Sequence, residues 1–295
     1  MVWPIPENPT FGAIVGAGGS CFVSFVDENT VHKSHEIWVD GRQRSLRSQS
    51  AENEIAREAA VFERLGQVGT RTAHPCIITF YGVDEIAPGV HALRLERAPL
   101  GSLRDYIQTH ADAAPPESTR LRMSMQVAQG LAHAHACGVI HCDVSCRNVL
   151  VFDSHGKDDK DDKGDKKGKE DQGGLHVKIC DWAGSIIKGH ELYSKRGTYE
   201  EMQYELPCRG RVLGETPVLE CEIFALGSAI YEIMAWARPF QGLSNDEVEQ
   251  RYAREEFSSL DGIAVAGIID KCWHEQYGSI QEVVDELSLY ISTHN

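Results

Sequence analysis

The sequence predicts an α+β protein, with a small antiparallel sheet in its first part and a larger helical part behind it. Between residues 11 and 36, short apolar runs alternate with glycine-rich turns, a pattern typical of antiparallel strands. From Leu121 to Val139, apolar residues recur at helical spacing. A later run, Glu222 to Met234, is apolar enough to form a buried helix. Strands therefore come first along the chain, and helices follow.

The composition indicates a globular protein with reduced cysteines. Its 295 residues, 42% hydrophobic and 25% charged, can bury one large core or two modest ones. A formal charge of −15 argues against nucleic acid or an anionic membrane as a partner. No apolar run approaches the roughly 20 residues that span a bilayer, and the N-terminus lacks a signal-peptide pattern. The nine cysteines form no CxxC pair, so we expect free thiols in a cytoplasmic or nuclear protein.

A polar loop, residues 141–148, lies between the expected helix and a β-branched strand that begins at Val149. Asp143 and Asn148 stand five positions apart on this loop and can converge on one point. An aspartate there can take a proton from a hydroxyl, and an asparagine oxygen can bind a divalent metal. An ordinary polar turn is the alternative. A zinc site made by the histidine and cysteines of the loop is disfavoured by their spacing.

A second acidic residue follows the next short apolar strand. Val177 to Cys180 leads into Asp181-Trp182-Ala183-Gly184, and this aspartate is a candidate metal ligand. With this stretch in place, the sequence resembles the eukaryotic protein kinase family. The loop 141–148 is similar to that family's catalytic loop, and Asp181 opens a stretch similar to its metal-binding triplet. The resemblance runs from about Phe11 to Ile291 and is greatest to small stand-alone kinase-like proteins of filamentous fungi.

The resemblance implies a protein-kinase-like bilobal fold. Residues 1–97 would form an N-lobe with an antiparallel sheet and one main helix, and residues 98–295 a larger, mostly helical C-lobe. Between the lobes, Leu95 would be the gatekeeper, and backbone groups of Glu96 to Ala98 would bind the adenine edge. Leu150 is assigned to the nucleotide site by the same resemblance.

The glycine-rich turn after the first strand is the candidate phosphate loop. Small residues there let backbone N–H groups approach a polyphosphate, although an ordinary hairpin turn explains them equally well. In the family, a third glycine stands where this chain has Cys21. The residues assigned to nucleotide binding in this stretch are Gly16, Ala17, Gly18, Gly19 and Val23, the last packing against adenine.

Lys33 is the only lysine among the first 150 residues. In the family, a lysine on the third strand pairs with the α- and β-phosphates and with a helix glutamate. Residues 51–65 have helical periodicity, and Glu58 shares a face with an apolar residue one turn later. Glu58 is therefore the expected partner of Lys33, whereas Glu54 and Glu63 remain alternatives on the same helix.

The resemblance implies ATP as phosphate donor and Mg²⁺ as its metal. Asp181 and Asn148 would hold the metal, and Asp143 would take the proton of the acceptor hydroxyl. Ser145 stands where serine/threonine kinases place a lysine that contacts the γ-phosphate. Arg147 can supply that charge, as an arginine does in many tyrosine kinases, or it packs the loop.

The activation segment, residues 185–207, departs from the family in two ways. Cys142 replaces the arginine that binds a phosphorylated segment. Near Pro207 the family has a glutamate that pairs with an arginine beyond Cys272-Trp273. Here Cys208 stands at about the glutamate's place, and the arginine's place falls near Ser279-Ile280. Both partners of this ion pair are missing, which avoids leaving one buried charge unpaired. We therefore expect this ionic link to be lost.

Two polar stretches are expected outside regular structure. Residues 41–50 are polar and predict a loop. Residues 154–174 include a charged run without a single apolar residue, so we expect a disordered insert within a hairpin.

Together these residues predict an active protein kinase that modifies a protein hydroxyl, serine or threonine rather than tyrosine. A pseudokinase that binds nucleotide weakly or acts as a scaffold is the alternative. A small-molecule kinase is disfavoured by the helical part, residues 222–291. We expect protein substrates, no nucleic acid or membrane partner, and a monomer.

Overall fold

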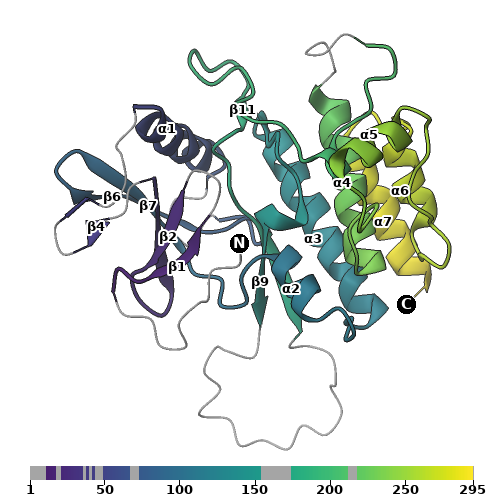
Figure 1. The fold of residues 1–295 in the computed structure, drawn as a ribbon, viewed down its shortest axis with the longest axis horizontal. Coiled ribbons are helices and arrows are strands. Elements are labelled where there is room, and N and C mark those ends of the chain that lie inside the picture. The colour runs from purple at the N-terminus through teal and green to yellow at the C-terminus, as the bar shows by residue number, and fades with distance from the viewer. Residues whose placement is uncertain are drawn as a thin grey trace, which may run out of the picture.

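A five-stranded antiparallel sheet forms the N-terminal part of the protein in the computed structural model, which describes residues 11–17, 21–35, 38–39, 42–43, 49–66, 73–153, 174–211 and 218–294 (Figure 1). The strand order is β1-β2-β3-β7-β6. The strands are β1 (Ile14–Ala17), β2 (Phe22–Phe25), β3 (Thr30–Ser34), β6 (Phe80–Ala87) and β7 (Val90–Glu96). Helix α1 (Gln49–Arg64) packs against β6 and β7.

The alternation of β3 determines where its lysine points. Val31 and Lys33 are both buried and, two positions apart, share one face of the strand. On the neighbouring strands, Lys33 lies opposite Val23 and Leu93. The sheet therefore carries Lys33 on its covered face.

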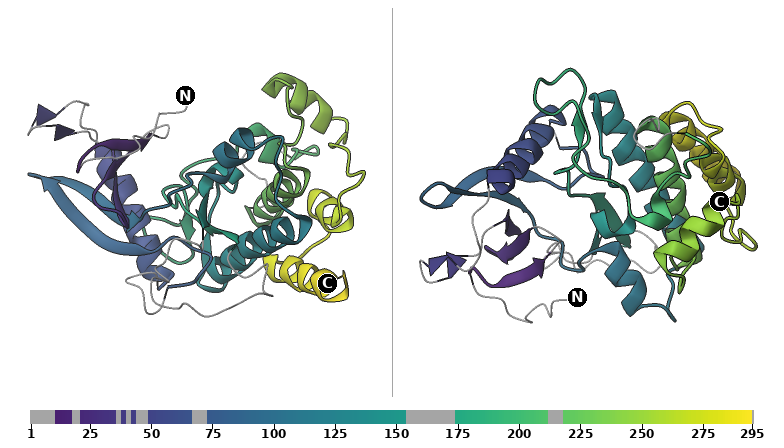
Figure 2. Two further views of the ribbon diagram at one scale, coloured as in Figure 1. Left: turned by 90° about the horizontal axis from the view of Figure 1, so that it is seen from below. Right: turned by 45° about the horizontal axis from the view of Figure 1, so that its top comes forward.

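The C-terminal part is helical, and Figure 2 shows it beside the sheet in two further views. With α1, the described residues contain seven α-helices. The other six are α2 (Leu103–Thr109), α3 (Glu117–Ala136), α4 (Val218–Ala235), α5 (Asn245–Tyr252), α6 (Ala266–Trp273) and α7 (Ile280–His294). Helix α4 is almost entirely buried and packs against α3 and α6. This arrangement is the bilobal kinase-like α+β fold expected from the sequence.

Several short elements complete the fold. The hairpin of β9 (Val149–Asp153) and β10 (Leu175–Ile179) flanks the expected charged insert, of which residues 154–173 lie outside the described residues. The remaining elements are β4 (Trp38–Val39) paired with β5 (Arg42–Gln43), β8 (Val139–Ile140) paired with β11 (Ile186–Ile187), and the 3₁₀ turns η1 (Cys146–Asn148) and η3 (Met202–Tyr204).

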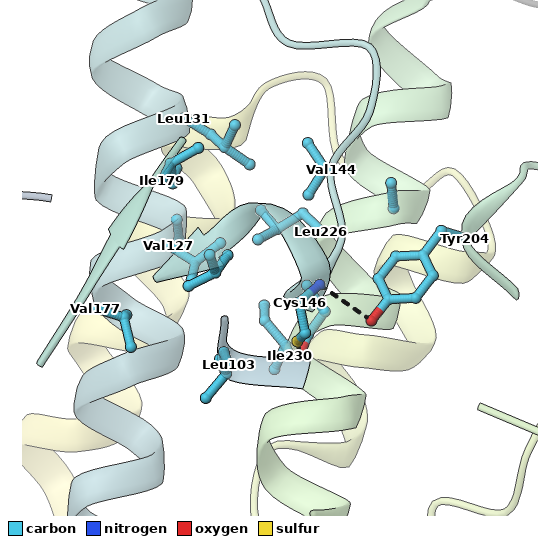
Figure 3. Close-up of a cluster of buried hydrophobic side chains, with 14 of the residues drawn as sticks. Leu103, Val127, Leu131, Val144, Cys146, Val177, Ile179, Tyr204, Leu226 and Ile230 are labelled. Atoms are coloured by element: carbon cyan, nitrogen blue, oxygen red, sulfur yellow. Dashed lines mark hydrogen bonds between the residues drawn. The ribbon is translucent and has the colours of Figure 1, made fainter. Parts of the chain in front are cut away.

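The loop 141–148 is embedded in the core by its own apolar side chains. Figure 3 shows Val144 and Cys146 among side chains from α3 and α4. Because these side chains are buried, the polar residues between them are held at fixed positions. The labelled neighbours are Leu103, Val127, Leu131, Val177, Ile179, Tyr204, Leu226 and Ile230.

One expectation from the sequence is wrong. The predicted loop at 41–50 contains strand β5 and the first residues of α1, because pairing with β4 and burial of α1 are not visible in local polarity. Close to Cys208, a different ionic link is present. Arg209 forms ion pairs with Glu255 and Glu275.

Local sequence determines two helix boundaries. Ser102 caps α2 by accepting a hydrogen bond from the backbone N–H of Asp105 at 3.1 Å. The helix expected from Leu121 is α3, and Gly138, just beyond its end, has a φ of 76°. No helix in the described ranges is long and apolar enough to cross a membrane.

The close approach of α4 and α6 at Gly227 predicts a stability change. A Cβ at Gly227 would lie 2.5 Å from the Cβ of Cys272, so Gly227→Ala should lower the free energy of unfolding by about 1–3 kcal/mol. Gly267 of α6 has nothing within 4 Å of the same position, and Gly267→Ala should be neutral or stabilise by up to about 1 kcal/mol. Denaturant unfolding measures both, and equal effects would contradict this packing.

Candidate active site

Lys33 lies between two carboxylates from different parts of the chain. Its Nζ is 2.8 Å from Glu58 Oε2 on α1 and 2.6 Å from Asp181 Oδ1 beyond β10. Burial alone would lower the pKa of Lys33, but Asp181 and Glu58 outweigh burial and hold that pKa well above its usual value. Burial would raise the pKa of Asp181, yet Lys33 holds it below the usual range. Burial raises the pKa of Glu58 above its usual value, although Lys33 opposes this shift.

The second oxygen of Glu58 fixes the residue after Asp181. Glu58 Oε1 accepts a hydrogen bond from the Trp182 backbone N–H at 3.1 Å. Asp181 has a φ of 64°, a left-handed conformation that a non-glycine residue keeps only where its surroundings enforce it. Trp182 is fully buried beside His141, with ring centroids 4.5 Å apart. Trp182 is therefore accommodated in the core while Asp181 is turned toward Lys33.

Four buried aromatic rings form two pairs. Besides His141 and Trp182, the rings of Phe62 and Phe80 stack with centroids 4.9 Å apart. Phe62, Phe80 and Trp182 belong to one hydrophobic core that runs through both parts of the protein. Aromatic packing therefore supports α1 and the Asp181 stretch from beneath.

Asp143 is oriented by two residues of its own loop. Arg147 Nη2 lies 3.0 Å from both carboxylate oxygens, and Asn148 Nδ2 donates to Asp143 Oδ2 at 3.0 Å. Burial raises the pKa of Asp143 above its usual value, although Arg147 and His141 oppose this. A raised pKa brings the carboxylate closer to the range in which it can take up a proton.

The backbone of this loop is held by Glu222 of α4. Its carboxylate accepts from the backbone N–H groups of His141 at 3.0 Å and Cys142 at 2.9 Å, and from His135 Nε2 at 2.9 Å. These bonds stabilise Cys142 at a φ of 65°. Although burial alone would raise it, the pKa of Glu222 is lowered by His135 and the backbone donors. Sequence reasoning did not assign Glu222 this role, although an acid inside an apolar helix is a signal for it.

A second buried carboxylate of α4 holds the activation segment. Arg104 of α2 donates to Glu232 at 2.5 and 2.9 Å and to Glu201 at 3.0 and 3.2 Å. The Tyr204 hydroxyl also donates to Glu232 and accepts from the Cys146 backbone N–H at 3.5 Å. The segment therefore lies directly beside the loop 141–148. Sequence reasoning missed this network, whose signal is again an acid within an apolar helix.

The middle of the activation segment is closed by its own ion pair. Arg196 Nη2 lies 2.6 Å from Glu200 Oε2, and burial raises the pKa of Glu200 to about 7. The backbone N–H of Gly197 donates to the Gly184 carbonyl at 2.8 Å. With Cys142 fully buried, the segment is held by these contacts and not by an arginine at position 142.

The predicted nucleotide residues of the sheet lie around Lys33. Val23 is directly opposite Lys33, and a Cβ at Gly16 would lie 3.4 Å from the Cβ of Val23. Ala17 ends β1, whereas the predicted Gly18 and Gly19 lie outside the described residues.

The expected hinge has one amide left for a ligand. The N–H of Glu96 donates to the Thr79 carbonyl at 2.9 Å, and the N–H of Arg97 donates to the Asn29 carbonyl at 2.8 Å. Among the described residues, the N–H of Ala98 donates no hydrogen bond. The Glu96 carboxylate lies 2.6 Å from Lys178 Nζ, so this side chain is engaged in an ion pair. A contact of Glu96 with adenine would therefore use its backbone.

Leu150, also assigned to the nucleotide site, lies on β9 and is half-buried against the core. It forms an isolated bridge with Ser102, just beyond the hinge. Its position is therefore compatible with a contact beneath a nucleotide that enters at the hinge.

Asp181 and Asn148 fit a magnesium–nucleotide complex. Asp181 keeps 38% of its side chain exposed, and both hydrogen bonds of the Asn148 amide use its nitrogen, which leaves its oxygen as a ligand. Mg²⁺ commonly takes one or two protein oxygens and completes its shell with phosphates and water. Among the described residues, no group of three or more His, Cys, Asp and Glu side chains offers a complete metal site. The donors present therefore suit a metal that arrives with the nucleotide.

Comparison with known proteins gives the same classification. A family model described as protein tyrosine and serine/threonine kinase matches residues 19–283. A serine/threonine/tyrosine-protein kinase of Arabidopsis thaliana is 24% identical over 231 residues, which are 76% of this chain and 50% of the relative. The serine/threonine-protein kinase PknB of Mycobacterium leprae is 23% identical over 260 residues, which are 85% of this chain and 36% of the relative.

A third relative, a probable serine/threonine-protein kinase of Arabidopsis thaliana, is 26% identical over 207 residues, which are 68% of this chain and 18% of the relative. The chain spans at most half the length of these three relatives. Because the family model matches most of the chain, this protein belongs to the protein tyrosine and serine/threonine kinase family.

Proposed function

We propose that the protein is an active, ATP-dependent protein kinase that phosphorylates serine or threonine. The observation that carries this proposal is the contact of Lys33 with both Glu58 and Asp181, with Asp143 oriented on the neighbouring loop. This set of charges matches what phosphoryl transfer requires, since catalysis there depends on positioning and on neutralising phosphate charge.

Each residue has a role that follows from its contacts. Lys33, held by Glu58, would bind phosphate oxygens, and Asp181 with the Asn148 oxygen would hold Mg²⁺. The metal, when bound with ATP, neutralises charge that develops on the phosphates. Asp143 would orient the acceptor hydroxyl and take its proton, because its carboxylate is fixed and its pKa is raised.

Arg147 would supply the positive charge that Ser145 cannot. Its side chain is 52% exposed, so it does not pack the core, and only Nη2 contacts Asp143. Its other nitrogens can reach toward a phosphate or an acceptor. An arginine at this place also suits tyrosine substrates. Serine or threonine is favoured by the names of the similar proteins, which are serine/threonine or serine/threonine/tyrosine kinases.

The cellular setting is part of the proposal. None of the nine cysteines, all of which belong to the described residues, forms a disulfide, as in a reducing compartment, and this supports a cytoplasmic location. We propose protein substrates and a monomeric enzyme. The net charge of −15 speaks against binding to nucleic acid or anionic membranes.

Transfer of labelled γ-phosphate from Mg-ATP to casein and to the protein itself tests the proposal. Wild type should transfer label, and Asp143→Asn should lose at least about 100-fold, because Asn cannot accept the proton. Phospho-residue analysis should find serine or threonine. No transfer by wild type, with nucleotide binding intact, would instead establish the nucleotide-binding pseudokinase.

The pairing of Lys33 predicts that two glutamates of α1 behave differently. Glu58→Gln removes the charge beside Lys33 and should lower kcat/KM on the order of 100-fold through misplaced phosphates. Glu54, one turn before Glu58 on α1, pairs instead with His35, with Oε2 and Nε2 3.6 Å apart. Glu54→Gln is therefore the matched control and should leave kcat/KM unchanged. Equal losses in the two variants would refute the assignment of Glu58.

A further inference from the structure

Arg209 lies just beyond the activation segment and binds residues at the ends of two helices, α5 and α6. Its Nε lies 3.0 Å from Glu255 Oε1, and its Nη2 lies 2.9 Å from Glu255 Oε2. Nη2 also donates to the Trp273 carbonyl at 2.7 Å, and Nη1 binds Glu275. Arg211 Nη2 lies 2.5 Å from the other oxygen of Glu275. We call Arg209, Arg211, Glu255 and Glu275 the arginine clamp.

The arginine clamp joins elements that are distant in sequence. Glu255 follows the end of α5, and Trp273 and Glu275 lie at the end of α6. A cation at the carboxyl end of a helix is favourable because the last carbonyls carry partial negative charge. Arg209 therefore binds the end of α6 both through Glu275 and through an unpaired helix carbonyl.

Backbone geometry indicates that the clamp is a built feature. Arg209, Glu255 and Glu275 have φ values of 49°, 56° and 54°. Non-glycine residues keep this left-handed conformation only where their surroundings compensate for its strain. The three residues meet at the guanidinium of Arg209, whose side chain is only 17% exposed. An ion pair that forms incidentally on a surface needs no such strained backbone.

The arginine clamp is separate from the ion pair that the family resemblance implies. The resemblance placed a glutamate at about position 208 and an arginine near Ser279-Ile280, and the chain has Cys208 at the first place. The clamp is made instead by the neighbouring residues Arg209 and Glu275.

The stretch between residues 204 and 209 is fixed at both ends. At its start, Tyr204 is bound to Glu232 and lies beside the Cys146 amide of the loop that carries Asp143. At its end, Arg209 is bound to α5 and α6. The stretch therefore begins beside the loop at which the acceptor of the proposed reaction would lie.

We propose that Arg209 is a positioning residue for the protein substrate, which acts by keeping this stretch of the activation segment against α5 and α6. The inference rests on the proposed kinase function. None of the contacts of Arg209 involves Lys33, Asp181 or Asn148. Loss of the clamp should therefore weaken use of a protein acceptor and leave ATP binding intact.

Steady-state kinetics with casein and Mg-ATP test this inference. Arg209→Ala should raise the KM for casein on the order of tenfold, while the KM for ATP changes by less than about twofold. Arg251→Ala is the matched control. Arg251, at the end of α5, also pairs with a glutamate, Glu256, at 2.9 Å, but both of these side chains are exposed. This control should behave as wild type.

A double-mutant cycle separates the clamp from general destabilisation. Arg209→Ala combined with Glu255→Gln should be no worse for casein than Arg209→Ala alone, because the side-chain contacts of Glu255 are all made with Arg209, whereas Glu275 also binds Arg211. Should Arg209→Ala fail to fold, Glu255→Gln removes one arm of the clamp and should raise the same KM less.

The outcomes distinguish the inference from the function on which it rests. Unchanged kinetics for Arg209→Ala, or equal changes in both KM values together with a lower Tm, would overturn the positioning role while leaving the kinase assignment intact. No phosphate transfer by wild type would overturn the kinase assignment, and the inference with it.

Discussion

The buried charge of Lys33 is the constraint on which the rest of the site depends. Lys33 is only 6% exposed, so its positive charge must be compensated by nearby negative charge. The two carboxylates beside it come from α1 and from the stretch after β10. Satisfying Lys33 therefore fixes the orientation of α1 and the position of Asp181 at once. The exposed side of Asp181 is where a phosphate-bound metal would lie.

Helix α4 gives the same kind of support from the other side. It is apolar, yet it carries two fully buried carboxylates, Glu222 and Glu232, which are ten positions or about 15 Å apart along the helix. Glu222 holds the backbone of the loop that carries Asp143, and Glu232 holds Arg104 of α2 and Tyr204 of the activation segment. One helix thus positions both the loop of Asp143 and the activation segment.

Sequence reasoning located the residues whose roles depend on local pattern. Lys33 was identifiable as the only lysine of the N-terminal half, and Glu58 by its helix face. Both lie where expected, although the roles assigned to them remain predictions. The arginine clamp was not predictable, because Arg209 and Glu275 are 66 positions apart and neither matches the family pattern. The strand at Arg42–Gln43 was missed because pairing, and not local polarity, determines so short an element.

The central claim is that Lys33, Asp181 and Asn148 form a site for ATP together with Mg²⁺. The most direct measurement is calorimetric titration of the wild-type protein with ATP, in the presence and in the absence of Mg²⁺. The account predicts that ATP binds and that Mg²⁺ strengthens binding, because Asp181 and the Asn148 oxygen gain a ligand only when the metal is present. Equal affinity under both conditions, or no binding, would contradict it.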